Sequence, residues 1–487
     1  MLKLDDPTLL RQQALIGDTW CNADDSATLD VTDPATGERL GTVPSMGGAE
    51  TRRAVAAAQA AFTQWSKTTA KQRGQILRKW HDLILAHQED LARIMTAEQG
   101  KPLSESRGEI TFAASFIDWF AEQARRVDGD VLASPATDRR LIVLKQPVGV
   151  CAAITPWNFP AAMITRKAAP ALAAGCTMVL KPAAQTPFSA LALAELAQRA
   201  GLPAGCLSVV PGPAEPIAHE LSSNPLVRKL TFTGSTAIGA KLMAAGAQNI
   251  QKLSLELGGN APFIVFDDAD LDAAVEGALI SKYRNAGQTC VCANRLYVQD
   301  SVHDAFVEKL SARVSELKIG RGTEPGVQVG PLIDERAMAK AEALYEDAIQ
   351  HGAHPHLPGG RTALPGLTDQ FFKPAILTGV TPDMRVAREE IFGPIAPIIR
   401  FTDEDDVIRL ANDTEYGLAS YFYSQNLARV WRVAETLEFG MVGVNTGLIS
   451  TAEAPFGGVK QSGLGREGSQ YGIDEYLEMK YVCLGLA

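Results

Sequence analysis

The run Gly149-Val-Cys-Ala-Ala-Ile154 is a short apolar segment that ends at Thr155-Pro156. Its length and its closing proline predict a buried strand that reaches a loop. Similar apolar runs occupy residues 177–180, 208–211 and 229–232, and helical patterns occupy residues 190–200 and 235–247. Strands separated by helices of this length predict a parallel, doubly wound α/β sheet.

The alternation continues on both sides of this core. Helical patterns come first, and two further sets of strands and helices follow Leu255. We expect helices at 50–67, 71–98, 270–284 and 301–316, strands at 262–266 and 295–298, and a third set through 405–411, 421–423 and 440–445. The apolar run near 168–180 suits a buried helix followed by a strand, whereas 351–370 is the most irregular stretch and reads as a surface loop. A chain of 487 residues exceeds one simple core, so we expect two or three domains.

Composition excludes several classes of protein. Hydrophobic residues make up 46% and charged residues 21%, as in ordinary soluble globular proteins. The net charge of −10 argues against a nucleic-acid or anionic-membrane partner. The first residues lack the apolar core of a signal peptide, and no apolar run is long enough to span a bilayer. The seven cysteines form no paired spacing, which predicts reduced thiols in the cytoplasm.

A metal site is not expected. His351, His354 and His356 cluster, but no cysteine or carboxylate triad accompanies them in this loop-like segment.

One cysteine and one glutamate stand out as candidates for chemistry. Small residues at Ala286-Gly287 lead into Cys290, and Glu256 stands 34 positions earlier before Gly258-Gly259. Each could be structural when taken singly. A thiol nucleophile and a carboxylate base, each on a small-residue turn, together suit a covalent reaction with a hydrolytic second half.

Three positions in the first sheet could bind an anionic ligand or stabilise developing charge. The segment 231–239 follows a strand and opens a helix, which directs backbone N–H groups at an anion, although its glycine pattern is not the usual dinucleotide fingerprint. Lys181 stands at the carboxyl end of a strand, where ligands bind in open α/β sheets. Asn158, fixed between Pro156 and Pro160, could present its amide to an oxyanion. Each position has a plain structural alternative: a helix start, a solvated lysine and a turn asparagine.

Six segments in order resemble the signature motifs of the NAD(P)-dependent aldehyde dehydrogenase superfamily, and the resemblance covers essentially the whole chain. These segments are Pro156-Trp-Asn-Phe-Pro160, Lys181-Pro182-Ala183, Phe232-Thr-Gly-Ser235, Leu255-Glu-Leu-Gly-Gly259, Gly287-Gln-Thr-Cys290 and Glu390-Ile-Phe-Gly-Pro394. Within the superfamily the chain looks most like the succinate-semialdehyde dehydrogenases, including the bacterial enzymes of 4-aminobutyrate breakdown. That narrower likeness rests on residues 163–167, 284–292 and 455–468.

The resemblance implies a role for each matched residue. Cys290 would be the nucleophile, Glu256 the base for deacylation, and Asn158 with the Cys290 N–H the oxyanion hole. Lys181 would bond the adenosine ribose, Ser235 would meet the pyrophosphate and Glu390 would hold the nicotinamide ribose, while Trp157, Gly234, Leu257 and Phe392 would line the cofactor.

The family branch also implies a substrate with a distal carboxylate. Arg166 and Arg284, with Ser450, match the positions that bind this group, and guanidinium groups clamp carboxylates bidentately. The alternative is that each arginine forms an internal salt bridge. We expect succinate semialdehyde as the substrate, with glutarate semialdehyde or another ω-carboxy aldehyde as the alternative, because one methylene changes pocket affinity by only about 1–3 kcal/mol.

Ala184 bears on the choice of cofactor. Many NAD-preferring relatives carry a glutamate three residues after the ribose-binding lysine, and here that position is Ala184. The missing carboxylate removes repulsion against a 2′-phosphate, so we expect NADP with NAD tolerated.

The implied fold has three parts. A Rossmann-like NAD(P)-binding domain would use residues 1–127 and 147–255, an α/β catalytic domain residues 256–454, and a small β oligomerisation domain residues 128–146 and 455–487. Family members are dimers or tetramers, so the resemblance implies a homo-oligomer, and we expect a homotetramer.

Other interpretations remain open at this stage. A cysteine hydrolase that transfers no hydride would need a silent cofactor site, and a non-enzymatic use of the fold usually tolerates loss of Cys290 or Glu256. Cys292 could form a reversible disulfide with Cys290 under oxidation, or simply pack beside the site.

Overall fold

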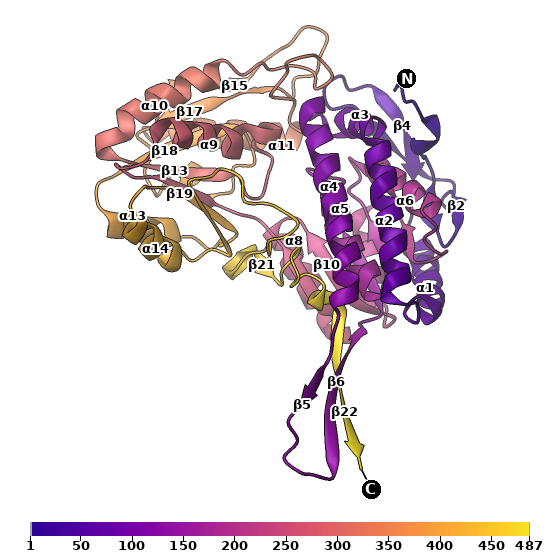
Figure 1. The fold of residues 1–487 in the computed structure, drawn as a ribbon. Helices are drawn as coiled ribbons and strands as arrows, with labels where there is room; N and C mark the ends of the chain where they lie inside the picture. The colour runs from indigo at the N-terminus through magenta and orange to yellow at the C-terminus, as the bar shows by residue number, and fades with distance from the viewer. Residues whose placement is uncertain (1, 487) are drawn as a thin grey trace.

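The computed structural model describes residues 2–486 as two α/β lobes and a narrow projecting β arm (Figure 1). The first lobe is built from the N-terminal half of the chain, and the second from the residues after β11 (Lys252–Glu256). The arm projects from the junction of the lobes and contains the C-terminal strand.

An eight-stranded sheet forms the centre of the first lobe. Its order is β2-β1-β9-β8-β7-β10-β11-β21, and the five central strands are parallel. The strands not yet given are β1 (Ala14–Ile16), β2 (Thr19–Cys21), β7 (Val150–Ile154), β8 (Thr177–Lys181), β9 (Leu207–Val209), β10 (Val227–Thr233) and β21 (Gly463–Leu464). The predicted doubly wound parallel sheet is therefore confirmed.

Helices cover both faces of this sheet, and a separate apolar core lies under each group. One face carries α2 (Ala70–Ala86), α3 (Gln88–Gln99), α4 (Leu103–Gln123), α5 (Ala162–Ala174) and α6 (Pro187–Arg199), and the other carries α1 (Gly48–Trp65), α7 (Ala214–Ser223) and α8 (Thr236–Gly246). Burial on both faces explains why the strands are continuous apolar runs rather than alternating ones.

The strand register brings the predicted ligand residues to one edge. Ile154 pairs with Lys181 and Phe232, and Thr233 pairs with Glu256. Because these strands are parallel, the loops that follow them leave the sheet on the same side.

A seven-stranded sheet forms the second lobe, in the order β14-β17-β18-β13-β12-β19-β20. Its strands are β12 (Ala261–Val265), β13 (Ala293–Gln299), β14 (His354–Leu357), β17 (Ala375–Thr378), β18 (Ile395–Phe401), β19 (Ala419–Tyr423) and β20 (Met441–Val444). The helices are α9 (Leu271–Tyr283), α10 (Asp300–Ser315), α11 (Glu335–Gln350), α12 (Arg385–Arg388), α13 (Glu404–Asn412) and α14 (Leu427–Thr436). All strands except β14 run parallel to their neighbours.

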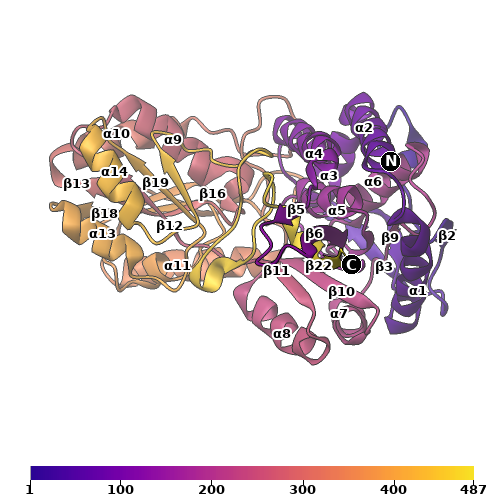
Figure 2. The same cartoon turned by 60° about the horizontal axis from the view of Figure 1, so that its bottom comes forward.

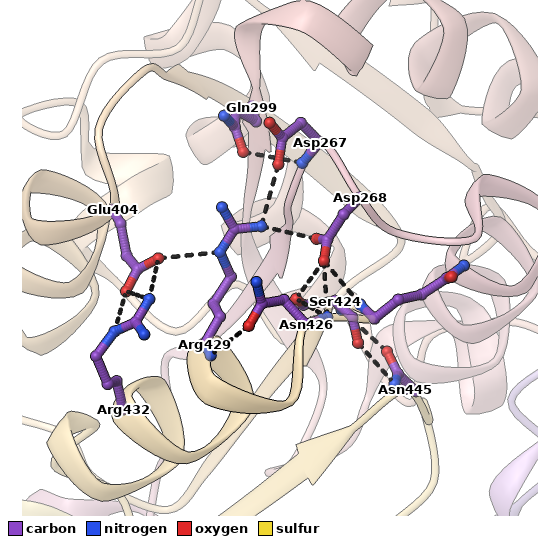
Figure 3. Close-up of polar contacts among 10 residues, drawn as sticks. Asp267, Asp268, Gln299, Glu404, Ser424, Asn426, Arg429, Arg432 and Asn445 are labelled. Carbon is purple, nitrogen blue, oxygen red and sulfur yellow. Dashed lines mark hydrogen bonds and ion pairs between the residues drawn. The ribbon is translucent and has the colours of Figure 1, made fainter.

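Ion pairs close the carboxyl ends of this second sheet. Arg429 on α14 bonds Asp267 and Asp268, which follow β12, and also bonds Glu404 at the start of α13 (Figure 3). Asp268 in turn accepts hydrogen bonds from Ser424 and from the backbone of Asn426 at the end of β19. The edge where ligands usually enter an α/β sheet is therefore filled by this lobe's own side chains.

The arm is a three-stranded antiparallel sheet of β5 (Asp130–Leu132), β6 (Arg139–Pro147) and β22 (Leu477–Gly485) (Figure 2). The arm uses only the last part of the expected 455–487 segment, because β21 instead pairs with β11 in the first sheet. Two small hairpin-like sheets, β3 (Thr28–Thr32) with β4 (Arg39–Pro44) and β15 (Gly360–Arg361) with β16 (Phe372–Lys373), complete the strands. Among residues 2–486, no helix is long and apolar enough to cross a membrane.

Two local predictions are wrong. The helix expected over 71–98 is two helices, because the backbone leaves helical geometry at His87, and Glu89 and Asp90 then favour a new helix N-terminus. The loop expected over 351–370 contains β14, in which His354 and His356 are exposed. As the last strand of its sheet, β14 tolerates Pro355, which hid it from the sequence pattern.

Candidate active site

Two hollows meet at Cys290, between the carboxyl ends of the first sheet and the amino ends of the second. Each measures about 260–270 Å³, and Phe159, Met163 and Cys290 line both. Cys290 stands just before β13. The chain crosses from β11 to β12 through Gly258-Gly259, and a Cβ on Gly259 would lie 2.3 Å from the Cys290 carbonyl oxygen. This close approach explains why residue 259 is a glycine.

A strained turn presents Cys290. Asn285, Ala286 and Gly287 have φ values of 52°, 54° and 76°, so three consecutive residues adopt left-handed geometry. Such a run is uncommon outside glycine and asparagine, and strain of this kind clusters at functional sites. Gln99 donates to Asn285 Oδ1 at 3.0 Å, and Gln288 Oε1 accepts from the backbone of Ile333. These buried bonds hold the turn in place.

The Cys290 thiol lines both hollows but is otherwise enclosed. Burial raises its pKa to about 12, the Arg166 guanidinium opposes this, and the Glu390 and Glu256 carboxylates reinforce it. Enclosure therefore favours the thiol over the thiolate, and a base must take its proton before attack.

Cys292 points away from this position. Its Sγ lies 3.5 Å from both the Lys282 and the Ala293 carbonyl oxygens, and the residue is 5% exposed. All seven cysteines are free thiols. The oxidative lock with Cys290 stays a prediction.

Asn158 faces Cys290 from the loop after β7. Its side-chain Nδ2 donates to the Gln288 carbonyl at 3.0 Å, which uses one of the two amide hydrogens. Its own carbonyl accepts from Lys101 Nζ at 2.7 Å and from Asn285 Nδ2 at 3.1 Å. The residue is thus fixed at both ends, with one side-chain hydrogen left for an oxyanion.

Glu256 ends β11 and is 1% exposed. Neither of its carboxylate oxygens has a hydrogen-bond partner among the described residues. Burial and the neighbouring Glu467 carboxylate raise its pKa well above the ordinary value, against the pull of Arg166 and Lys167. A carboxylate of this kind is poised to hold a proton, and to pass it on, at pH values above the ordinary range of a carboxyl group.

Glu467 and Lys167 belong to this environment, and sequence reasoning assigned neither a role. Burial opposes ionisation of Glu467, but Lys167 and Arg166 hold its pKa below the ordinary value. Lys167 contacts Glu467 directly and donates to Thr233 Oγ1 at 2.7 Å. Glu467 lies 300 positions from Lys167, and no local pattern connects residues at that separation.

The first hollow contains the three residues predicted to bind a carboxylate: Arg166, Arg284 and Ser450. They are not equivalent. Arg166 Nε pairs with Glu467 Oε2 at 2.5 Å, so it forms the internal salt bridge that was the alternative in the sequence analysis. Arg284 forms no ion pair with any residue of 2–486, and its Nε has no hydrogen-bond partner there.

Glu105 also lines the first hollow, and sequence reasoning missed it. Burial raises its pKa to about 7, although Lys101 and Arg284 oppose the shift. Its Oε2 accepts from the Asn285 backbone at 2.9 Å.

The second hollow collects most of the residues predicted to bind a cofactor. Trp157, Gly234, Ser235, Leu257, Glu390 and Phe392 all line it. The Trp157 and Phe392 rings meet edge to face, with centroids 5.6 Å apart. Glu390 accepts from the Gly259 backbone at 2.9 Å, which fixes its carboxylate at the mouth.

These residues fit a dinucleotide. Ser235 caps α8 without a side-chain bond, so the first N–H groups of that helix are open to an anion. Lys181 stands at the end of the neighbouring strand β8, where its Nζ bonds the Pro182 carbonyl at 3.0 Å. Burial lowers the Lys181 pKa to about 8. Ala184 is exposed and leaves open space where a longer side chain would stand.

Comparison with known proteins matches this architecture. The model of the aldehyde dehydrogenase family matches residues 20–482. The chain belongs to the aldehyde dehydrogenase family. It is 64% identical to the glutarate-semialdehyde dehydrogenase of Pseudomonas aeruginosa over 99% of this chain and the whole of that protein. It is 63% identical to the succinate-semialdehyde dehydrogenase [NADP(+)] of Escherichia coli, with both chains fully covered.

The fold of this aldehyde dehydrogenase also matches solved structures. The crystal structure of an E. coli NADP-dependent enzyme superposes with a TM-score of 0.98 at 63% identity, over 99% of this chain and all of that one. The predicted fold class is thereby confirmed, and the chain is an enzyme rather than a structural reuse of the fold.

Proposed function

We propose that this aldehyde dehydrogenase oxidises succinate semialdehyde to succinate with NADP. The observation that supports the substrate class is the first hollow, which runs from Cys290 to the unpaired Arg284 guanidinium. The Nε atom of the half-buried Arg284 is itself buried without a partner, which is costly, and a substrate carboxylate beside this guanidinium compensates that cost. The similarity to semialdehyde dehydrogenases supports the same choice.

The chemistry begins with Cys290. Its Sγ loses its proton to a water molecule and attacks the aldehyde carbon, and the carbonyl oxygen becomes an alkoxide. The second Asn158 amide hydrogen and the Cys290 N–H bind this oxygen, an arrangement whose single donors are typically worth about 2.7–4 kcal/mol. A nicotinamide cofactor held by the residues of the second hollow would supply the acceptor for the hydride that leaves the substrate carbon. Cys290 is then acylated as a thioester.

Glu256 acts in the second half. Its carboxylate takes a proton from water, the resulting hydroxide attacks the thioester carbonyl, and the Cys290 thiolate leaves with the proton returned to it. Lys167 and Arg166 hold Glu467 ionised beside Glu256. This negative charge keeps the pKa of Glu256 high, so that its carboxylate accepts a proton readily.

The cofactor residues act by binding and orientation. Trp157, Leu257 and Phe392 enclose one end of the second hollow, and Glu390 would hold the nicotinamide ribose there. Gly234 and Ser235 present the start of α8 to the pyrophosphate. The E. coli relative's stated use of NADP(+) supports the choice that Ala184 suggests, with NAD tolerated.

Glutarate semialdehyde is the second candidate. The P. aeruginosa relative that acts on it is as similar to this chain as the succinate-semialdehyde enzyme is. An additional methylene alters binding by only about 1–3 kcal/mol, so a pocket discriminates the two semialdehydes weakly.

The arm suggests self-association, and the free thiols suggest a cytoplasmic site of action. Val131, Met479 and Tyr481 are exposed on its short sheet at 76%, 77% and 60%. Exposed apolar strands of this kind mark an interface, so a homo-oligomer, dimer or tetramer, is proposed. Seven free thiols, one of them exposed at Cys483, suit the reducing cytoplasm.

Paired arginine variants test the substrate. Arg284→Leu should raise KM for succinate semialdehyde at least about 30-fold while barely changing KM for an uncharged aldehyde of equal length, since a hydrogen-bonded charge contributes about 2–5 kcal/mol. Arg166→Leu leaves Glu467 with Lys167 alone, so it should impair both aldehydes. Equal losses for both aldehydes in Arg284→Leu would refute carboxylate recognition by this residue. Assays with both semialdehydes and both cofactors complete the test.

A further inference from the structure

A buried ion pair lies beside the oxyanion residue and is not part of the proposed chemistry. Lys101 follows α3, Glu109 lies on α4, and their side chains are 1% and 2% exposed. Lys101 Nζ lies 2.5 Å from Glu109 Oε2. Removing two charges from water costs several kcal/mol per ion, so a pair at this depth needs further bonds to persist.

Those further bonds all reach the loop that carries Asn158. Lys101 Nζ donates to the Asn158 carbonyl at 2.7 Å. Glu109 Oε1 accepts from the backbone N–H groups of Ala161 at 2.9 Å and Ala162 at 3.2 Å. The pair therefore grips both ends of the segment 158–162, and Glu109 also satisfies open donors at the start of α5.

Lys101 lines the first hollow, but two of its three ammonium hydrogens are already committed to protein acceptors. An ammonium has three hydrogens. One points to Glu109, one to Asn158, and the cation lies 4.1 Å from the centroid of the Phe159 ring. Arg284, not Lys101, is the cation free to meet a carboxylate.

We propose that Lys101, held by Glu109, is a positioning residue that sets the Asn158 amide toward the developing oxyanion. The inference rests on the proposed function, in which Asn158 stabilises that oxygen. Lys101 fixes the Asn158 carbonyl, and the Gln288 carbonyl fixes one side-chain hydrogen. With both fixed, the second hydrogen has one direction left. A misplacement of about 1 Å costs about 100-fold in rate at such a site.

A double-mutant cycle tests this role. Lys101→Met should lower kcat/KM by about 100-fold for both charged and uncharged aldehydes. In the Asn158→Ala background the same change should lower kcat/KM by no more than about twofold, because the group through which Lys101 acts is gone. The Kd for NADP, measured by fluorescence without substrate, should stay unchanged. A purely structural role would give equal losses in both backgrounds and would overturn the inference.

Two further variants protect the test against misfolding. Lys101→Met leaves Glu109 buried alone, so Lys101→Met/Glu109→Gln removes both charges and should show the same cycle. Lys229→Met is a matched control, because Lys229 is also buried, bonds Ser254 at 2.6 Å, approaches Glu475 and lies 5.0 Å from the Tyr476 ring. It should keep wild-type kcat/KM. A loss in Lys229→Met equal to that in Lys101→Met would overturn the inference.

The activity of the wild type distinguishes failure of the positioning role from failure of the proposed function. An active wild type with additive losses refutes the positioning role alone. If the wild type does not reduce NADP with any of the aldehydes, the proposed function and this inference are refuted together.

Discussion

At the scale of single residues, the site depends on which charges already have partners. Arg166 and Lys167 are committed to Glu467, Lys101 to Glu109, and Arg284 to none of the described residues. Residue type alone treated the two pocket arginines as equal. Their partners make Arg166 part of the environment of Glu256 and make Arg284 the candidate for the proposed contact with the substrate carboxylate.

The buried Glu256 predicts a defined pH dependence. Its pKa is raised by burial and by Glu467, so the basic form accumulates only as pH rises. The deacylation rate, measured after the burst of reduced cofactor, should therefore rise with pH from neutral into the alkaline range. Glu467→Gln removes the repelling carboxylate and frees two cations, which lowers the Glu256 pKa and should move this profile to lower pH. An unchanged profile would show that Glu467 does not act on the base.

The base itself can be removed without blocking the first half of the reaction. Glu256→Gln should give a burst of reduced cofactor equal to the enzyme concentration and then stall as a thioester. Stopped-flow absorbance and mass spectrometry of the acylated Cys290 measure the two events. Turnover at the wild-type rate would place the base elsewhere.

Ala184 and Lys181 predict how cofactor preference changes. Ala184→Glu should place a carboxylate near the ribose and lower the preference for NADP over NAD by at least tenfold, about 1.4 kcal/mol, through repulsion of the 2′-phosphate. Ala184→Gln is the matched control of equal size. In the wild type, the pKa of Lys181 near 8 means that its charge is lost above that pH, so KM for NADP should rise there more than KM for NAD. Parallel changes for both cofactors would contradict a phosphate contact by Lys181.

At the scale of elements, the Cys290 turn concentrates strain at one point. Gly287 has φ +76°, and a Cβ there would lie 2.3 Å from the Gly393 carbonyl oxygen, which precedes β18. The turn and the loop of Glu390 therefore pack backbone to backbone.

Gly287→Ala should separate these two loops and displace Cys290. We expect kcat to fall by about 100-fold, in line with a shift of about 1 Å in the nucleophile. Gly326→Ala is the matched control, since Gly326 has φ +77° but no atom within 4 Å of its Cβ position. The control should lose about 1 kcal/mol of stability and keep its activity. Equal kcat values for the two variants would contradict the packing argument.

The main elements could be predicted from local pattern, because their strands are short apolar runs between helices. The strand over residues 150–154, the helix α8 and the turn before Cys290 were all expected. Strand β11 and helix α4 were not, since β11 carries Lys252 and Glu256 and α4 begins after Pro102 without a side-chain N-cap. The Lys101–Glu109 and Lys167–Glu467 pairs depend on how distant elements pack, and no spacing rule predicts them. The resemblance to a known family supplied the roles of Cys290 and Glu256.

At the scale of the whole molecule, the two sheets present opposite ends of their strands to the junction between the lobes. The carboxyl ends of the first sheet and the amino ends of the second bound the site, while Arg429 and its partners close the far edge of the second sheet. One junction therefore holds both hollows, and the arm leaves the molecule next to it.

The arm predicts how the proposed oligomer can be broken. Met479 and Tyr481 share one face of β22, because alternate residues of a strand point the same way. Met479→Glu/Tyr481→Glu should dissociate the oligomer, which light scattering or sedimentation would detect as a smaller mass. Lys480→Glu, on the opposite face between them, is the control and should leave the mass unchanged. A charged pair that left the mass unaltered would place the interface elsewhere.

The contact between Lys167 and Glu467 has a consequence for synthesis on the ribosome. The two residues are 300 positions apart, and translation proceeds at about 5–20 residues per second, so roughly 15–60 s separate their appearance. Throughout that interval the nascent chain exposes Lys167 and Arg166 without their counter-ion, and during its later part Cys290 as well. Until Glu467 emerges, the candidate nucleophile Cys290 is made but its surroundings are incomplete, so we expect a newly synthesised chain to be more open to electrophiles and to chaperones during this interval than after folding.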